Sequence, residues 1–255
     1  MNSLNLKSLG IFNNTMLVGC LSATFSAISF SGMVFIINDI KETYSAIEIT
    51  FFRTFSLVVV IFPYLKLKQI AAFRGLSKYI YLRAVFGSLG LIFNFISFQK
   101  FPISLASFLI SSMTLLFTVM GGALVLKETL SFKQVLGVVG CALAIYIYNG
   151  TQIYQIDHNM ILYPLFGSLF SAAAFLSLRK VANKHHFLTI LFFLSLVSLT
   201  FSCILSDLRG FTKISWQDIR LYEIVVLGFS TQYFLTASFK FLYQTEEDSR
   251  HSVRC

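Results

Sequence analysis

Polar side chains recur at helical spacing inside two apolar segments of this sequence. In residues 79–99 the series is Arg83, Gly87, Gly90, Asn94 and Ser97, and in residues 102–125 it is Ser104, Ser107, Ser111, Thr114 and Thr118. Intervals of three and four residues place each series on one face of a helix. Such faces could line a polar cavity, or they could be packing surfaces, because small residues let helices approach closely. Both interpretations stay open for the second series. Asn94 favours a cavity for the first, because an amide is costly to expose to lipid.

Two further segments carry polar residues of the same kind. They are Ser22, Ser26 and Ser29 in residues 16–37, and Gly228, Thr231, Gln232 and Ser238 in residues 219–242. We therefore predict a cavity between the first, third, fourth and eighth apolar segments. The expected substrate-binding residues are Arg53, Asn94, Ser97, Ser107, Ser111, Thr114 and Gln232.

Arg53 lies inside the apolar segment 46–65, about 10 Å from its start by helical rise. A central Arg costs about 2.5–3.5 kcal/mol on insertion scales, so it should face protein or water and find a partner. We expect a charge that contacts substrate or a gate, balanced by Glu48 or Asp39. The alternative is an arginine that reaches the membrane surface or forms a structural ion pair.

Three more charged residues are candidates for a charge-pairing or gating role, namely Glu48, Arg83 and Glu128. Arg83 is five residues from a basic loop, which favours a side chain that extends to the membrane surface. Glu128 lies beside Lys127 and Lys133, which favours a loop-capping role over proton coupling.

The composition puts these residues in a membrane. The chain has 255 residues, of which 56% are hydrophobic and only 12% charged, and its mean hydropathy is +0.76. A soluble domain carries roughly twice that share of charge. We expect an all-α polytopic membrane protein, because helices satisfy their backbone groups in lipid and the alternation of barrel strands is missing. The eight expected spans are 16–37, 46–65, 79–99, 102–125, 131–148, 159–178, 187–205 and 219–242.

The basic residues indicate the orientation. With a cytoplasmic N-terminus, the inner segments hold twelve of the 20 Lys and Arg residues and the outer segments hold four. This bias predicts cytoplasmic N- and C-termini and a multi-pass protein of the bacterial inner (plasma) membrane. It also accounts for the net charge of +9 without nucleic acid, because the basic residues form no single patch.

The first three spans resemble the sixth, seventh and eighth. A shift of 141 brings Gly87 onto Gly228 and Phe93 onto Phe234, and a shift of 145 brings Phe30 onto Phe175. A unit of five spans would enter the membrane from the opposite side in its second copy, as in many secondary transporters. We expect a first repeat at 16–148, a partial second repeat of three helices at 159–242, and a polar cytoplasmic tail at 243–255.

Two motifs resemble a known family. The stretch from Leu126 to Ile147, with Glu128, Gln134 and two glycines, is similar to the end of the fourth helix and the fifth helix of EamA-type permeases of the drug/metabolite transporter superfamily. EITFFRTF, with Glu48 and Arg53, resembles bacterial S-adenosylmethionine uptake carriers of that superfamily. The resemblance implies two inverted five-helix repeats, the second of which lacks its last two helices here.

We therefore expect a secondary transporter of small polar or zwitterionic metabolites that works by alternating access, with S-adenosylmethionine uptake as the activity implied by the resemblance. The alternatives are a truncated, inactive remnant and a membrane assembly subunit that needs a partner chain. No catalytic, nucleotide-binding or metal-binding motif is found, so we expect no enzyme and no cofactor. The expected partners are a small-molecule substrate, the lipid bilayer, and either further copies of the chain or a completing partner.

Overall fold

The computed structural model describes the backbone of residues 3–70, 75–125, 160–206 and 214–254, together with six scattered positions between 136 and 147. Side chains are described for residues 15–70, 75–124, 160–206 and 214–241 and for those six positions. The helices in this part of the chain are α1 (Ser3–Ile40), α2 (Ala46–Leu67), α3 (Lys78–Lys100), α4 (Ile103–Val125), α6 (Leu162–Val181), α7 (Phe187–Leu205) and α8 (Ile219–Arg254). These same residues contain no strand, in agreement with the expected all-α class.

Six of the helices are long and apolar enough to cross a membrane. They are Thr15–Ile40, Ala46–Leu67, Lys78–Lys100, Ile103–Leu124, Leu162–Val181 and Phe187–Leu205. The prediction is thus confirmed for six of the eight spans. The fifth expected span, 131–148, lies mostly outside the described residues, as does Glu128. α8 forms where the eighth was expected but is not among the six, because Glu223, Gln232 and Lys240 reduce the apolar character of its described part.

Local signals fix where several helices begin. Ser45 caps α2 by accepting a hydrogen bond from the backbone N–H of Glu48 at 3.2 Å, and Glu48 Oε2 accepts from the backbone N–H of Ser45 at 2.8 Å. This reciprocal pair satisfies two amide groups that the first turn leaves free. Ser77 caps α3 in the simpler way, through the backbone N–H of Tyr79.

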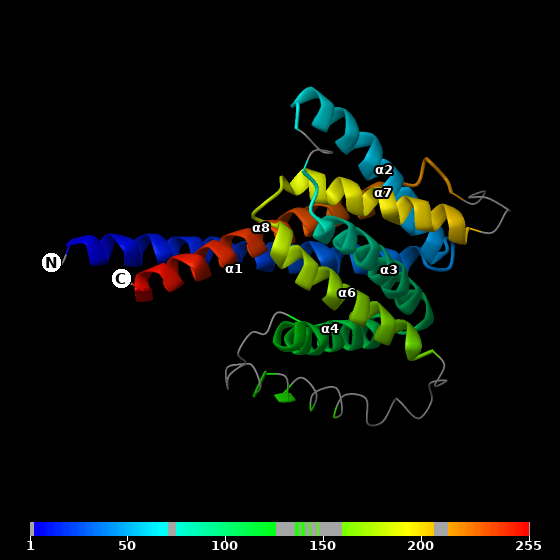
Figure 1. Cartoon of the computed structure of the whole chain (residues 1–255). Coiled ribbons are helices and arrows are strands. Elements are labelled where there is room, and N and C mark those ends of the chain that lie inside the picture. The colour runs from blue at the N-terminus through cyan, green and yellow to red at the C-terminus, as the bar shows by residue number, and fades with distance from the viewer. Residues whose placement is uncertain are drawn as a thin grey trace.

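The helices pack in pairs that join the two ends of the sequence. α1 lies along α8, α3 lies along α6, and α2 packs against α7 (Figure 1). α4 covers α6 on the side away from α7. α1 and α8 run side by side and extend beyond the other helices at the end that carries both chain termini (Figure 1).

Aromatic contacts recur in corresponding pairs within the bundle. Its first half contains α1, α2 and α3, and its second half contains α6, α7 and α8. Three ring pairs have a counterpart when α1 is shifted by 145 residues onto α6, and α2 and α3 by 141 residues onto α7 and α8. Phe25–Phe234, with ring centroids 5.6 Å apart, corresponds to Phe170–Phe93 at 5.8 Å. Phe30–Phe98 at 6.3 Å corresponds to Phe175–Phe239 at 6.0 Å. Phe52–Tyr222 at 5.2 Å corresponds to Phe193–Tyr81 at 5.8 Å. The sequence matches at these shifts therefore correspond to matching contacts in space.

Candidate functional site

Two arginines lie in the interior of the helical bundle, and both reach α8. Arg53 of α2 is 3% exposed, and its Nη2 donates to the backbone oxygen of Gly228 at 3.3 Å. Arg83 of α3 is 4% exposed, and its Nη2 donates to Oε1 of Gln232 at 2.9 Å. Gly228 and Gln232 are four residues apart, so the two guanidinium groups contact neighbouring turns of α8, about 6 Å apart along its axis.

Glycines make room for both side chains. A Cβ atom at Gly228 would lie against Nε of Arg53 and 2.9 Å from its Cζ. A Cβ atom at Gly87, one turn along α3 from Arg83, would lie 2.8 Å from the Nη1 atom of that arginine. Any larger residue at either position would have to displace a guanidinium group, so these glycines shape the site.

The two arginines approach α8 from opposite ends of the bundle. Arg53 is near the start of α2 and Arg83 is near the start of α3. Consecutive spans run in opposite directions, so their starts lie at opposite faces of the membrane. The part of α8 from Gly228 to Gln232 is thus contacted by arginines from both ends of the bundle.

Neither arginine forms an ion pair with a described side chain. The salt bridges found among the described residues join Arg220 to Asp39 at 3.1 Å and to Asp218 at 2.9 Å. Nε of Arg53 and Nε of Arg83 are buried without a hydrogen-bond partner. Cζ of Arg53 lies 5.8 Å from the centroid of the Phe95 ring, within the range of a cation–π contact.

The expected counter-ions of Arg53 are engaged elsewhere. Glu48 caps α2 at its first turn, and Asp39 pairs with Arg220 at the end of α1. The favoured expectation for Arg83 was also wrong, because the side chain turns inward to Gln232 instead of extending to the membrane surface. The missing side chain at Gly87 leaves the room that the Arg83 side chain needs for this inward orientation.

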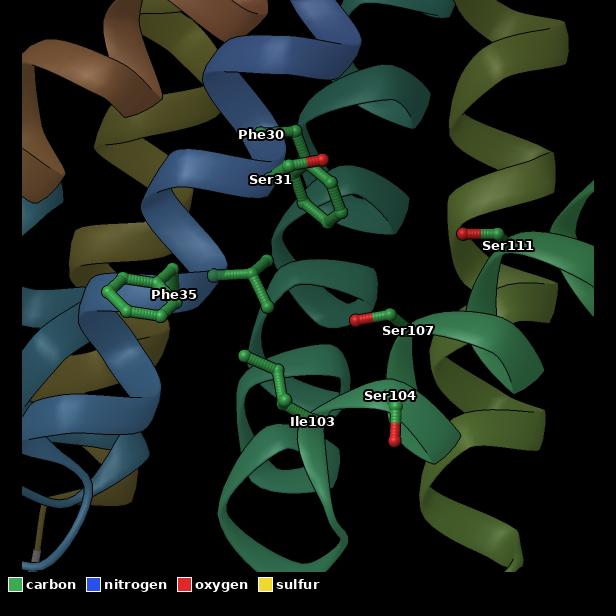
Figure 2. Close-up of a pocket in the computed structure, with 8 residues that line it drawn as sticks. Phe30, Ser31, Phe35, Ile103, Ser104, Ser107 and Ser111 are labelled. Atoms are coloured by element: carbon green, nitrogen blue, oxygen red, sulfur yellow. The ribbon is translucent and has the colours of Figure 1, made fainter.

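The serines of α4 line a separate groove. Its cavity volume is about 230 Å³, and the lining residues are Phe30, Ser31, Val34 and Phe35 of α1 with Ile103, Ser104, Ser107 and Ser111 of α4. Figure 2 shows the hydroxyl groups of Ser107 and Ser111 pointing toward α1. Ser104 and Ser111 are exposed, so the groove opens on the surface of the bundle.

An aromatic layer connects the groove to Arg53. Phe30 lines the groove and lies 6.3 Å from Phe98 of α3 between ring centroids. Phe95, one turn earlier on α3, is the ring that faces the Arg53 guanidinium. The groove and Arg53 are therefore neighbouring regions, and Phe30, Phe95 and Phe98 lie between them.

Three other predicted residues contact neither the groove nor the arginines. Nδ2 of Asn94 donates to Oγ of Ser171 on α6 at 3.1 Å, and its Oδ1 lies against Gly167 without a hydrogen-bond partner. Ser97 donates to the backbone oxygen of Phe93 in its own helix at 2.8 Å. Thr114 is 9% exposed, and its Oγ1 has no hydrogen-bond partner. Asn94 thus takes part in the packing of α3 on α6.

A polar cluster at one end of the bundle was missed by sequence reasoning. Nε and Nη2 of Arg220 donate to Asp218, and Nη1 donates to Asp39. Oη of Tyr44 donates to Oδ2 of Asp218 at 3.2 Å. The Arg220 hydrogen bonds lower the pKa of Asp218 most, although burial acts in the opposite direction. Both acidic residues flank predicted outer loops, which is the sequence signal that could have paired them.

Comparisons with known proteins agree with a membrane carrier. The model of the EamA-like transporter family matches residues 17–150. Pseudopaline exporters from two strains of Pseudomonas aeruginosa are each 27% identical over 181 residues, which cover 69% of this chain. The chain spans 61% of the length of these curated relatives.

Proposed function

This chain belongs to the EamA-like transporter family, and we propose that it is a secondary transporter of small polar or zwitterionic metabolites. We place it in the bacterial inner membrane, with both termini in the cytoplasm, because of the bias in its basic loops. The proposal includes a transport cycle of alternating access.

The repeated contacts are the observation that carries this mechanism. α1 lies on α8 as α6 lies on α3, and the ring pair Phe25–Phe234 between α1 and α8 has its counterpart in Phe170–Phe93 between α6 and α3. Two halves of opposite orientation can exchange conformations, so that a central site opens to one face and then to the other. α2 and α7, which pack on each other, would lie at the pseudo-two-fold axis between the halves.

The described residues fit three parts of such a cycle. The groove between α1 and α4 offers serine hydroxyls and aromatic rings to a small substrate. The aromatic layer of Phe30, Phe95 and Phe98 lies between the groove and Arg53 and would move when the central site opens. The Arg220 cluster fastens α1 to α8 at one end and would break when that end opens.

A comparison of metabolite pools tests whether the chain transports anything. Cells producing the wild-type chain should differ several-fold in at least one small polar metabolite from cells producing Gly228→Leu at equal membrane abundance. The leucine side chain would occupy the space of the Arg53 guanidinium. Identical pools in the two cell types would contradict the proposal.

S-adenosylmethionine is the substrate that we propose to test first. The motif around Arg53 supports this substrate, because it resembles S-adenosylmethionine uptake carriers. The two relatives are named as exporters of another compound, pseudopaline. The direction of transport therefore needs its own test. Radiolabelled S-adenosylmethionine should accumulate in vesicles of one orientation and not the other. Absence of accumulation in both orientations would exclude this substrate.

One observation favours a second candidate, a subunit that works with another chain or another copy of itself. α4 packs on α6 through Leu176 against Gly121, and Ser168 donates to the backbone oxygen of Ile110. The corresponding α1 residues, Ser31 and Ala23, are exposed. A helix from a partner could cover α1 as α4 covers α6. Cross-linking from a cysteine introduced at Ser31, followed by mass analysis, would identify the partner chain. Cross-linked products that contain only lipid would argue against this second candidate.

A further inference from the structure

The two halves of the fold contain the same packing positions but different chemistry. At a shift of 141 residues, Arg53 corresponds to Leu194, and Gly228 corresponds to Gly87. The contact is conserved as well: a Cβ atom at Gly228 would meet Arg53, and a Cβ atom at Gly87 would meet Cδ1 of Leu194 at 2.7 Å. A leucine therefore satisfies this packing position in one half, and an arginine occupies it in the other.

The second arginine shows the same substitution. Arg83 corresponds to Ile224, and its partner Gln232 corresponds to Leu91. Ile224 is 1% exposed and Leu194 is 4% exposed, so both aliphatic residues are buried as deeply as the arginines. The architecture of the fold does not require a cation at either position.

Burying these cations costs stability that the described protein groups do not recover. A buried charge needs a partner of opposite charge, and no described carboxylate lies within salt-bridge distance of Arg53 or Arg83. Each guanidinium has five N–H donors in a planar fork, and each donates one hydrogen bond to the residues that the structure describes. An oxyanion is the group that would use the remaining donors.

We propose that Arg53 and Arg83 together form a binding site for an oxyanion, either a carboxylate or a phosphate group, in the interior of the helical bundle. The proposal rests on the proposed function for its role, since the anion would be part of the transported substrate. Gly228 and Gln232 hold the two cations on neighbouring turns of α8, so that one substrate can contact both.

A binding measurement tests the site without requiring transport. The thermal unfolding midpoint of the purified full chain in detergent is followed against glutarate, inorganic phosphate, the uncharged diamide glutaramide, and chloride at matched ionic strength. Glutarate carries two carboxylates at the ends of a short chain, which suits two cations whose contact residues on α8 are one helical turn apart. The response to glutarate or to phosphate identifies the chemical class of the anion.

The second half of the fold supplies the test variants. Arg53→Leu and Arg83→Ile introduce the residues that the corresponding positions already contain. Each should fold and should weaken the apparent affinity at least about tenfold, through loss of a charge-assisted hydrogen bond. Lys240→Met is the matched control, because it removes a cation from the exposed part of α8 and should leave the affinity unchanged.

Three results would overturn the anion site. They are a wild-type chain that responds to neither anion beyond the chloride control, a wild-type response that glutaramide equals, and Arg53→Leu and Arg83→Ile chains that both keep the full response. If metabolite pools still change while anion binding fails, the transporter stands and this site falls. If anion binding succeeds while no pool changes, the site stands and the transport proposal falls.

Discussion

Gly228 on α8 and Gly87 on α3 occupy corresponding places in the two halves of the molecule, yet they pack against different side chains. Gly228 accommodates Arg53, which comes from the helix α2, and Gly87 accommodates Leu194 of the corresponding helix α7 together with Nη1 of Arg83 from its own helix. The same pairs of helices are joined by corresponding aromatic contacts, Phe52–Tyr222 at 5.2 Å and Phe193–Tyr81 at 5.8 Å. The shared contacts belong to the scaffold, and the difference identifies the residues that the scaffold does not need.

The same comparison separates two kinds of polar residue. Ser26 donates to the backbone oxygen of Thr231 at 2.9 Å, and its counterpart Ser171 lies against Gly90, the counterpart of Thr231. Serine in both halves at one packing position indicates a structural role. Arg53, Arg83 and Gln232 each correspond to an aliphatic residue in the other half, which favours a role in binding over a role in packing.

The largest expected effect comes from copying the cation into the other half. Leu194→Arg would bury a guanidinium at a position that is 4% exposed, and a central Arg costs about 2.5–3.5 kcal/mol on insertion scales. Membrane abundance and the thermal unfolding midpoint should both fall sharply. Leu194→Met controls for the change of shape and should cost under about 1.5 kcal/mol. A stable Leu194→Arg chain would show that the two halves tolerate charge equally.

The next effect sharpens the role of the glycine. Gly228→Ala places a methyl group against the Arg53 guanidinium, and such overpacking costs about 1–3 kcal/mol. We expect a lower unfolding midpoint and weaker anion binding together. Gly140→Ala is the control, because no atom of the described residues lies within 4 Å of a Cβ built at Gly140. Equal behaviour of the two variants would contradict the close contact at Gly228.

Making the halves alike should separate function from stability. Arg53→Leu should reduce transport at least about tenfold, which corresponds to one charge-assisted hydrogen bond. The unfolding midpoint in the absence of anion should stay the same or rise, because replacing a buried charge with an aliphatic side chain is often neutral or stabilising. A fall in the midpoint without loss of transport would reverse the assignment and make Arg53 structural.

The smallest effect concerns the polar cluster at one end of the bundle. Arg220 holds the pKa of Asp218 below its ordinary value near 3.9. The stabilisation from the charged Asp218 should therefore be fully present above about pH 4 and lost as the pH falls through the lowered pKa. Because the cluster is partly exposed and solvent screens its charges, we expect the smallest change in unfolding midpoint of the variants proposed here.

A single variant checks the pH dependence. Asp218→Asn should lower the unfolding midpoint at pH 7, and the difference from wild type should shrink toward pH 3. A difference that stays constant over this range would assign the effect to packing instead of charge.

Residue spacing predicted the helices and the residues that share a face, but not which helix each face meets. Arg53 and Gln232 were expected in the site. Arg53 contacts Gly228 of α8, and Gln232, one turn further along α8, accepts a hydrogen bond from Arg83. Asn94 was expected beside them, yet it joins α3 to α6 through Ser171. Arg83 was expected to favour the membrane surface, and it reaches Gln232, 149 residues away in the chain. Neighbour identity and helix register depend on long-range packing, which the period of a single helix does not contain.

The most direct test compares the wild-type chain with Arg53→Leu/Arg83→Ile, the double variant that gives both arginine positions the residues of the other half. Metabolite pools are measured in cells that carry equal amounts of each chain in the membrane. We predict that the wild type changes the pools of one or more metabolites bearing a carboxylate or a phosphate, and that the double variant restores the pools of cells without the chain. A double variant that changes the same pools as the wild type would contradict the claim that function resides where the two halves differ.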